Sequence, residues 1–145
     1  SKILIRQTAD KPIAAIDYTG VWFGRSIIGI TLAGNSPVSY EYVLAVLNSR
    51  FMEKAYQTIT GEKGRGFAQV KLASIRQLPF YVPDLSKNNE KNAYQDITSD
   101  ARRIMVLTKR AFEGDRSVIV QKQLRGLLDH VNERVDQLFG SMASA

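Results

Sequence analysis

The sequence predicts an α+β fold: a small twisted, mostly antiparallel sheet with a packed helix, followed by a C-terminal helical hairpin. Two observations lead to this prediction. Short runs rich in β-branched residues, separated by turn residues, fill residues 1–32. Apolar residues then recur at spacings of three and four, first after residue 39 and again over residues 92–138. Strands that precede helices in this way are typical of α+β domains.

The strands are predicted from their residue composition and from the proline and glycine residues that interrupt them. Residues 3–6 and 13–16 have the composition of short strands, and Pro12 restricts the backbone between them. Residues 21–32 continue the strand-rich section, where Gly24 and Gly29 permit a bulge or a close backbone approach. We expect these segments to form one sheet.

The next segment has the features of one buried amphipathic helix. Ser39 is a candidate N-cap, since its hydroxyl can accept a hydrogen bond from a free N–H of the first turn. The apolar stripe at helical spacing consists of Tyr40, Val43, Leu44, Leu47, Phe51 and Ala55. After a loop, residues 67–72 alternate as a half-buried strand does, and residues 73–78 predict one helical turn that Pro79 closes.

Two longer helices are predicted for the C-terminal part. Apolar residues recur helically from residue 92 to residue 112, and Gly114 ends that run. The second helix carries five apolar residues on one face: Leu124, Leu127, Val131, Val135 and Leu138. Two such helices in succession predict a hairpin.

Charge narrows the choice of partner. The net charge is +6, and residues 1–82 carry most of it. Ten Lys or Arg against five acidic residues give +5 there, whereas ten against nine give +1 in residues 83–145. Clustered cations favour a polyanion such as nucleic acid, because binding displaces condensed counterions. A domain whose basic charge serves only solubility is the alternative.

Composition also excludes several classes. The absence of cysteine excludes a disulfide framework and thiolate zinc sites. No apolar run reaches the roughly 18–20 residues that span a bilayer, and no signal peptide opens the chain. We therefore expect a cytoplasmic protein with no membrane partner. The chain begins at Ser1 rather than Met, which suggests a piece of a longer polypeptide.

A basic glycine-rich loop lies between the predicted helix and the strand that follows. Residues 60–66 read Thr-Gly-Glu-Lys-Gly-Arg-Gly. Glycine lets the backbone approach a phosphate or enter a groove, while Lys63 supplies a point charge and Arg65 a forked donor. The spacing is that of neither a Walker loop nor a dinucleotide fingerprint. By composition alone, an ordinary flexible turn is the alternative.

Several of these segments, taken in order, resemble one known family. They are Lys2-Ile3-Leu4-Ile5-Arg6, small residues ending in Asp17, Leu47-Asn48-Ser49, the basic loop, Phe67-Ala68-Gln69-Val70-Lys71 and Leu78-Pro79. This order resembles the TaqI-like C-terminal specificity domain, the target recognition part of adenine-specific DNA methyltransferases and fused restriction-modification enzymes. It is also similar to the recognition domains of type I specificity subunits. The ending Leu138-Phe139-Gly140 resembles the closing helix of the same family, with Phe139 in place of tyrosine.

The resemblance implies a DNA target recognition domain over residues 1–83 and a helical hairpin over residues 84–145 that packs on it or on a partner. The implied function is sequence-specific recognition of double-stranded DNA for an N6-adenine methyltransferase, whose catalytic domain is supplied in cis or in trans. S-adenosylmethionine is implied for that parent enzyme, and no cofactor is expected in this fragment. A protein-interaction module of a multisubunit DNA-modification complex, without DNA contact, is the alternative.

Seven side chains are candidates for DNA contact. Those expected to position phosphates are Arg6, Lys11, Arg25 and Lys71. Lys63 and Arg65 suit the acceptors of guanine, and Gln69 suits adenine. For Gln69 the alternative is a structural hydrogen bond with the loop.

No catalytic or metal site is expected in the fragment itself. Two motifs of the parent's catalytic domain, the Phe-x-Gly-x-Gly turn and Asn/Asp-Pro-Pro-Tyr, are missing from residues 1–145. Pro83-Asp84 lacks the Asp/Glu-x-Lys sequence that completes a restriction nuclease site. His130, the only histidine, is expected at a surface or an interface. Two alternatives stay open: that the parent also cleaves DNA as a type II restriction endonuclease, and that the chain is a nuclease with an unfamiliar metal site.

Overall fold

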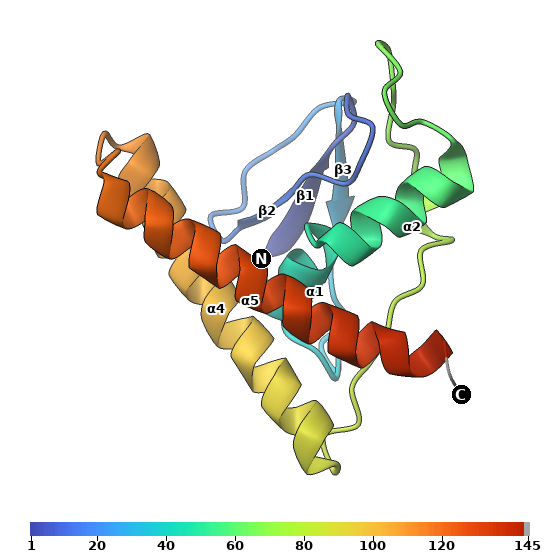
Figure 1. The fold of residues 1–145 in the computed structure, drawn as a ribbon. Helices are drawn as coiled ribbons and strands as arrows, with labels where there is room; N and C mark the ends of the chain where they lie inside the picture. Colours follow the sequence, from blue (N-terminus) through green and yellow to red (C-terminus); the bar gives the residue numbers. More distant parts are fainter. Residues whose placement is uncertain (144–145) are drawn as a thin grey trace. The chain divides into compact units, whose positions relative to one another are not determined.

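The structure, a computed structural model, describes the backbone of residues 1–143 and the side chains of residues 1–140. It divides into two compact units, which we call unit 1 (Ser1–Val82) and unit 2 (from Pro83 onward). Over the described residues, unit 1 contains a three-stranded antiparallel sheet and three short helices, and unit 2 contains two long helices (Figure 1). The predicted α+β class and the C-terminal helical hairpin are thereby confirmed.

Strand β1 (Lys2–Arg6) lies in the middle of the sheet, between β2 (Ala14–Asp17) and β3 (Ile27–Ile30). It pairs with both neighbours in antiparallel fashion. Successive side chains of a strand point to opposite faces, and accordingly Ile3 and Ile5 are fully buried while their neighbours along β1 are more exposed. The sheet thus presents one apolar face to the helices of unit 1.

The strand-rich section predicted over residues 21–32 is shorter than expected, because only residues 27–30 form β3. The preceding segment is fixed by a side chain instead of a ladder. The carboxylate of Asp17 accepts hydrogen bonds from the N–H groups of Thr19 and Val21, each at 2.9 Å. The ring of Phe23 then folds over Gly29, where a Cβ would lie 2.3 Å from the ring. A side-chain ring thus approaches the backbone closely at Gly29, whereas nothing lies within 4 Å of a Cβ built at Gly24.

The prediction of a single helix over residues 40–55 is wrong, because the helix is interrupted at Asn48. Helix α1 (Tyr40–Leu47) ends there, and α2 (Arg50–Thr60) begins after Ser49. Both helices have a serine N-cap whose hydroxyl accepts a hydrogen bond from an N–H three residues later, at 3.2 Å. The hydrogen bonds of Asn48 to Ala14 hold the chain where α1 ends, and the Ser49 cap begins the second helix directly after them.

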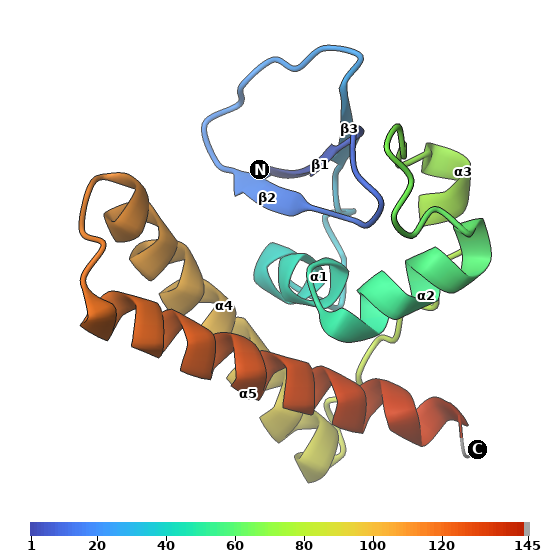
Figure 2. The ribbon, with the colours of Figure 1, turned by 45° about the horizontal axis from the view of Figure 1, so that its top comes forward.

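Helix α1 lies against β1 and β2, and its residues 42–47 are all buried (Figure 2). Helix α2 contacts both α1 and the single turn α3 (Leu72–Ile75). Packing on one face of the sheet therefore fixes α1, and α2 leads from it to the basic loop.

Unit 2 is a helical hairpin of α4 (Asn88–Phe112) and α5 (Val118–Ala143), which lie side by side (Figure 2). Leu107 of α4 forms an apolar cluster with Val120 and Leu127 of α5. Other buried apolar side chains of the hairpin are Ile97, Val131 and Val135. His130 contacts Asp100 across the two helices, and Arg134 pairs with Asp96 at 2.7 Å. Over the described residues, none of the helices combines the length and the apolar character needed to cross a membrane.

Candidate DNA-recognition site

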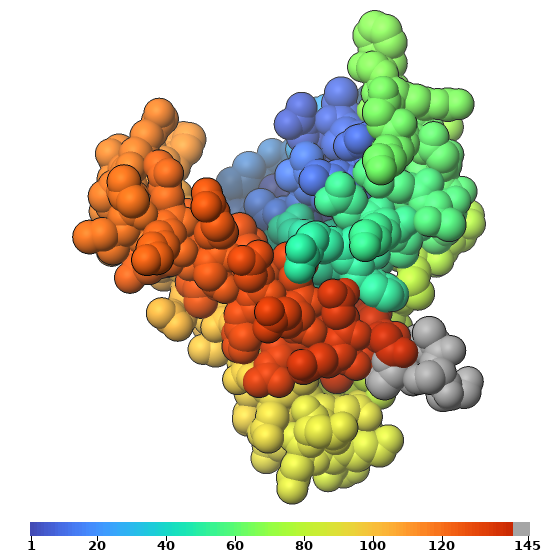
Figure 3. Space-filling view, in the orientation of Figure 1, coloured from blue at the N-terminus to red at the C-terminus, as the bar shows by residue number. Residues whose placement is uncertain are grey.

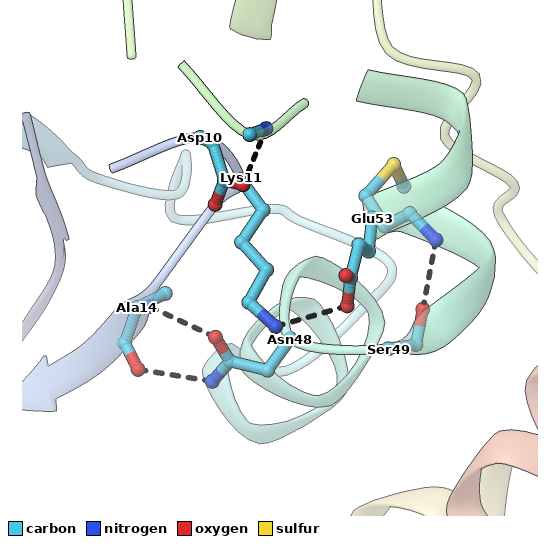
Figure 4. Close-up of polar contacts among 8 residues, drawn as sticks. Asp10, Lys11, Ala14, Asn48, Ser49 and Glu53 are labelled. Carbon is cyan, nitrogen blue, oxygen red and sulfur yellow. Dashed lines mark hydrogen bonds and ion pairs between the residues drawn. The ribbon is translucent and has the colours of Figure 1, made fainter. Parts of the chain in front are cut away.

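The basic loop leaves α2 at Gly61 and projects from unit 1 (Figures 1 and 3). Gly61 has φ +65°, a left-handed conformation in which its N–H donates to the carbonyl of Gln57 at 2.9 Å and ends the helix. One long contact ties the loop to the segment that follows β1: the N–H of Gly64 donates to Asp10 Oδ2 at 3.4 Å (Figure 4). The side chains of Lys63 and Arg65 are exposed.

A strand-like segment follows the loop. Ala68 and Val70 are buried, and the side chains between and beside them are exposed. Instead of the full strand predicted over residues 67–72, there is one antiparallel bridge between Thr8 and Gln69, supported by the N–H of Val70, which donates to the carbonyl of Gln7 at 2.7 Å. The ladder ends there because α3 begins at Leu72.

Tyr56 of α2 binds this segment through its side chain. Its side chain is fully buried, and its hydroxyl donates to the carbonyl of Gln69 at 3.3 Å. Burial raises the pKa of the Tyr56 phenol above its ordinary value. A neutral phenol is the form that donates this hydrogen bond, so α2 and the segment stay joined.

Backbone hydrogen bonds bring several of the residues that are predicted to contact phosphates or bases to one end of the sheet. The N–H of Gln7 donates to the carbonyl of Ser26 at 3.0 Å, and Gln7 also accepts from Val70. Arg6, Arg25 and Gln69 are each next to one of these bonded residues. The loop precedes Gln69 and Lys71 follows it. Figure 1 shows the end of β1, the start of β3 and the loop on the same side of unit 1.

The cations gathered there are available to a ligand. All of them are exposed, and no ion-pair partner among the described residues is found for Arg6, Arg25, Lys63 and Lys71. Arg65 is 69% exposed, and its Nη1 lies 3.8 Å from Glu62 Oε1. An exposed pair of that length contributes at most about 1 kcal/mol, so a phosphate or a base can displace the carboxylate.

Lys11 is arranged differently from the other six candidates. Its Nζ lies 3.0 Å from Glu53 Oε2, and the side chain is partly buried (Figure 4). The pair joins the segment after β1 to the first turn of α2. The structure therefore gives Lys11 a bond within unit 1, and its contact with a phosphate stays a prediction.

A family model of the TaqI-like C-terminal specificity domain matches residues 1–80. The chain belongs to this family. Specificity domains of this type support DNA sequence recognition in restriction-modification enzymes. Comparisons with curated proteins and with solved structures gave no match.

The motifs that this specificity domain shares with its family build the scaffold. The side-chain amide of Asn48 binds the backbone of Ala14 twice: it donates to the carbonyl at 2.9 Å and accepts from the N–H at 2.8 Å (Figure 4). Asp17, at the end of β2, pairs with Lys2 at 3.0 Å. Hydrogen bonds from Thr19 and the Lys2 ammonium hold the pKa of Asp17 well below its usual range.

The Leu-Pro motif has a similar role. The ring of Phe80 packs edge-on against Tyr42 of α1, with 5.9 Å between centroids. The Tyr42 hydroxyl donates to the carbonyl of Tyr81 at 2.9 Å. These contacts fix the chain that leaves the specificity domain.

One exposed residue near the cations was not among the candidates. Phe67 is 98% exposed, and in water its ring forgoes about 1.5–3 kcal/mol of burial. The sequence contained a sign of this exposure. Phe67 is an even number of positions from the polar residues Gln69 and Lys71, whereas the buried residues of the segment are Ala68 and Val70. No group of three or more His, Cys, Asp or Glu suited to a metal ion occurs among the described residues.

Proposed function

We propose that unit 1 binds duplex DNA with the cations at the loop end of its sheet and reads base sequence there for an N6-adenine DNA methyltransferase. One observation carries this proposal. Five exposed Lys or Arg residues from separate segments gather at one end of the sheet in a domain of the specificity family. Only Arg65 among them has an ion pair within the described residues, and that pair is long. Like charges brought together without compensation favour a polyanionic ligand.

The side chains divide by reach and chemistry. Arg6, Arg25 and Lys71 lie on or beside strand segments whose backbone is hydrogen-bonded, so they suit phosphates, which fix register and orientation. Lys63 and Arg65 are on the projecting loop and suit the acceptors of guanine in the major groove. The side chain of Gln69 is exposed. The hydroxyl of Tyr56 bonds the backbone carbonyl of Gln69 and not its side-chain amide. The amide therefore stays a candidate for adenine.

The methyltransferase partner would supply the chemistry. Its catalytic domain, in cis or in trans, would bind S-adenosylmethionine, take the target adenine out of the stack and methylate it. Unit 1 would hold the neighbouring base pairs so that only the correct site is presented. A cytoplasmic setting, where chromosomal DNA is found in bacteria, accompanies this role.

Unit 2 is proposed to connect unit 1 to that catalytic partner. Four apolar side chains of the hairpin are largely exposed: Val106, Phe112, Val118 and Ile119. Exposed apolar residues grouped near one turn are typical of protein contact surfaces. A protein-interaction role for the hairpin is compatible with DNA contact by unit 1 and does not require it.

A salt titration tests DNA contact by the loop. The wild-type chain and K63A/R65A are titrated with a fluorescein-labelled duplex of random sequence at several salt concentrations, and anisotropy gives Kd. Each lost phosphate contact lowers the slope of log K against log salt by about 0.9, so two lost contacts lower it by up to about 1.8. A contact with a base instead lowers affinity for a selected sequence and leaves the slope unchanged.

The matched control is K122A/R125A, which removes the same net charge from exposed positions of α5. The control is expected to keep the wild-type affinity and slope. Equal behaviour of wild type and K63A/R65A on both random and selected duplexes would remove the loop from the interface.

A further inference from the structure

The most exposed large apolar side chain of the described residues lies inside the cationic end of unit 1. Phe67 is 98% exposed and stands at an open hollow of about 390 Å³. The other residues that line this hollow are Glu62, Arg65, Gly66, Gln69 and Lys71. An exposed phenylalanine ring thus lies beside three side chains that can donate to phosphates or base edges, Arg65, Gln69 and Lys71, and beside one carboxylate, that of Glu62.

The backbone on the C-terminal side of Phe67 is held by hydrogen bonds, which fixes the point from which its side chain leaves the chain. Ala68 is buried and its N–H donates to the carbonyl of Arg65 at 3.3 Å. Val70 is buried and bonded to Gln7. Phe67 lies in the turn that this Arg65–Ala68 bond closes, between a glycine and a buried alanine, and its side chain is exposed like that of Gln69.

We propose that Phe67 inserts its ring against the face of a base in the bound duplex and opens the adjacent base step. The inference rests on the proposed function, since it needs DNA at this surface. The neighbouring cations would hold the phosphates and bring the apolar ring to the groove. Stacked bases expose only their edges there, so the ring reaches the face of a base by opening a step. Phenylalanine is one of the side chains that proteins use as wedges between base steps, and stacking on a base tolerates different sequences.

Such a contact has a specific consequence for recognition. A base step that unstacks easily accepts the ring at lower cost than a stiff one, so the domain would select sequence at a position where it makes no hydrogen bond to a base. Phe67 would therefore add specificity to the donors of Lys63, Arg65 and Gln69 rather than duplicate them.

Removal of the ring tests the proposal through affinity. The probe is a duplex that the wild-type chain selects from a random library, bound by wild type, F67A and F67L. Loss of base stacking predicts a 5- to 150-fold weaker Kd for F67A, of the order found when stacking aromatic residues are replaced by alanine, with the salt slope unchanged because no charge is lost. F67L keeps an apolar side chain without a π-face and is expected to recover only part of the affinity. F112A removes a comparably exposed phenylalanine (90%) from unit 2 and should bind as wild type does.

Fluorescence tests the geometry directly. Trp22 is the only tryptophan of the chain, so W22F/F67W carries a single indole at the proposed contact. Stacking predicts that the emission of this indole is quenched by the selected duplex, whereas unchanged emission would contradict stacking. In the DNA, 2-aminopurine placed in turn along one strand should brighten at one step with wild type and not with F67A.

The outcomes separate the inference from the function on which it rests. Salt-dependent binding by wild type together with unchanged affinity and 2-aminopurine signal in F67A would overturn the wedge and leave DNA recognition by the loop intact. If F67L equals wild type both in Kd and in 2-aminopurine emission, the π-face of the ring is not needed, and stacking of Phe67 on a base would be overturned. Absence of duplex binding by wild type would overturn both proposals.

Discussion

The two hydrogen bonds between Asn48 and Ala14 make a quantitative prediction about unit 1. Ala14 is in β2, an edge strand, and its outward N–H and carbonyl are both satisfied by the amide of Asn48, at 2.8 and 2.9 Å. Asn48→Ala removes both bonds. A typical intramolecular hydrogen bond contributes about 1 kcal/mol to stability, so the loss is at most about 2 kcal/mol.

Access of water to the freed groups determines how much of this stability N48A loses. Both bonds lie at an exposed position, so water can reach the freed groups of Ala14. We therefore expect N48A to lower the free energy of unfolding by about 1–2 kcal/mol. Urea unfolding followed by circular dichroism measures this as a lower midpoint with an unchanged m-value. Asn35→Ala, at an exposed turn position, is the control and should change stability by less than about 0.5 kcal/mol. Equal midpoints for N48A and N35A would refute the role given to this contact.

Two further predictions concern ionisable groups of the scaffold. The pKa of Asp17 is depressed below its ordinary value near 3.8, so its carboxylate stabilises the fold above that pH and the contribution is lost as pH falls through the folded-state pKa. D17N should therefore lower Tm at pH 7, and the difference from wild type should shrink below about pH 4; a constant difference down to pH 2 would contradict this. Tyr56→Phe should cost about 1 kcal/mol through the lost bond to Gln69. Because burial raises the Tyr56 pKa above 10.0, wild type should also lose stability above that pH faster than Y56F does, and parallel pH profiles would count against the buried phenol.

The element types were predictable from local patterns, but the point where a helix breaks was not. The spacing from Tyr40 to Ala55 fits one helix, and Ser49 alone is a weak stop signal inside it. What divides α1 from α2 is that Asn48 bonds Ala14, a residue 34 positions earlier in the chain. A single sequence shows no such long-range pairing. For the same reason the pattern after the loop predicted a full strand, although only one bridge, between Gln69 and Thr8, and the bond from Val70 to Gln7 form just after β1.

The candidate site was predictable in its chemistry and less so in its arrangement. The basic loop is recognisable from glycine and charge alone, and its exposure follows from having no side chain large enough to pack. The bond between Lys11 and Glu53 spans 42 positions and could not be anticipated. The alternation of residues 67–72 predicts a half-buried strand that includes Phe67, but Phe67 lies in a turn that ends before the bridge at Gln69, and its side chain is exposed.

The central claim is that the loop end of the unit 1 sheet is the surface that meets DNA. Nuclear magnetic resonance of the ¹⁵N-labelled chain, titrated with its selected duplex, tests it residue by residue. We predict the largest chemical-shift changes at the amides of residues 6–8, 25–26 and 62–71, with small changes along α4 and α5. Changes confined to the two helices of unit 2, with the loop amides unmoved at saturating DNA, would contradict the claim.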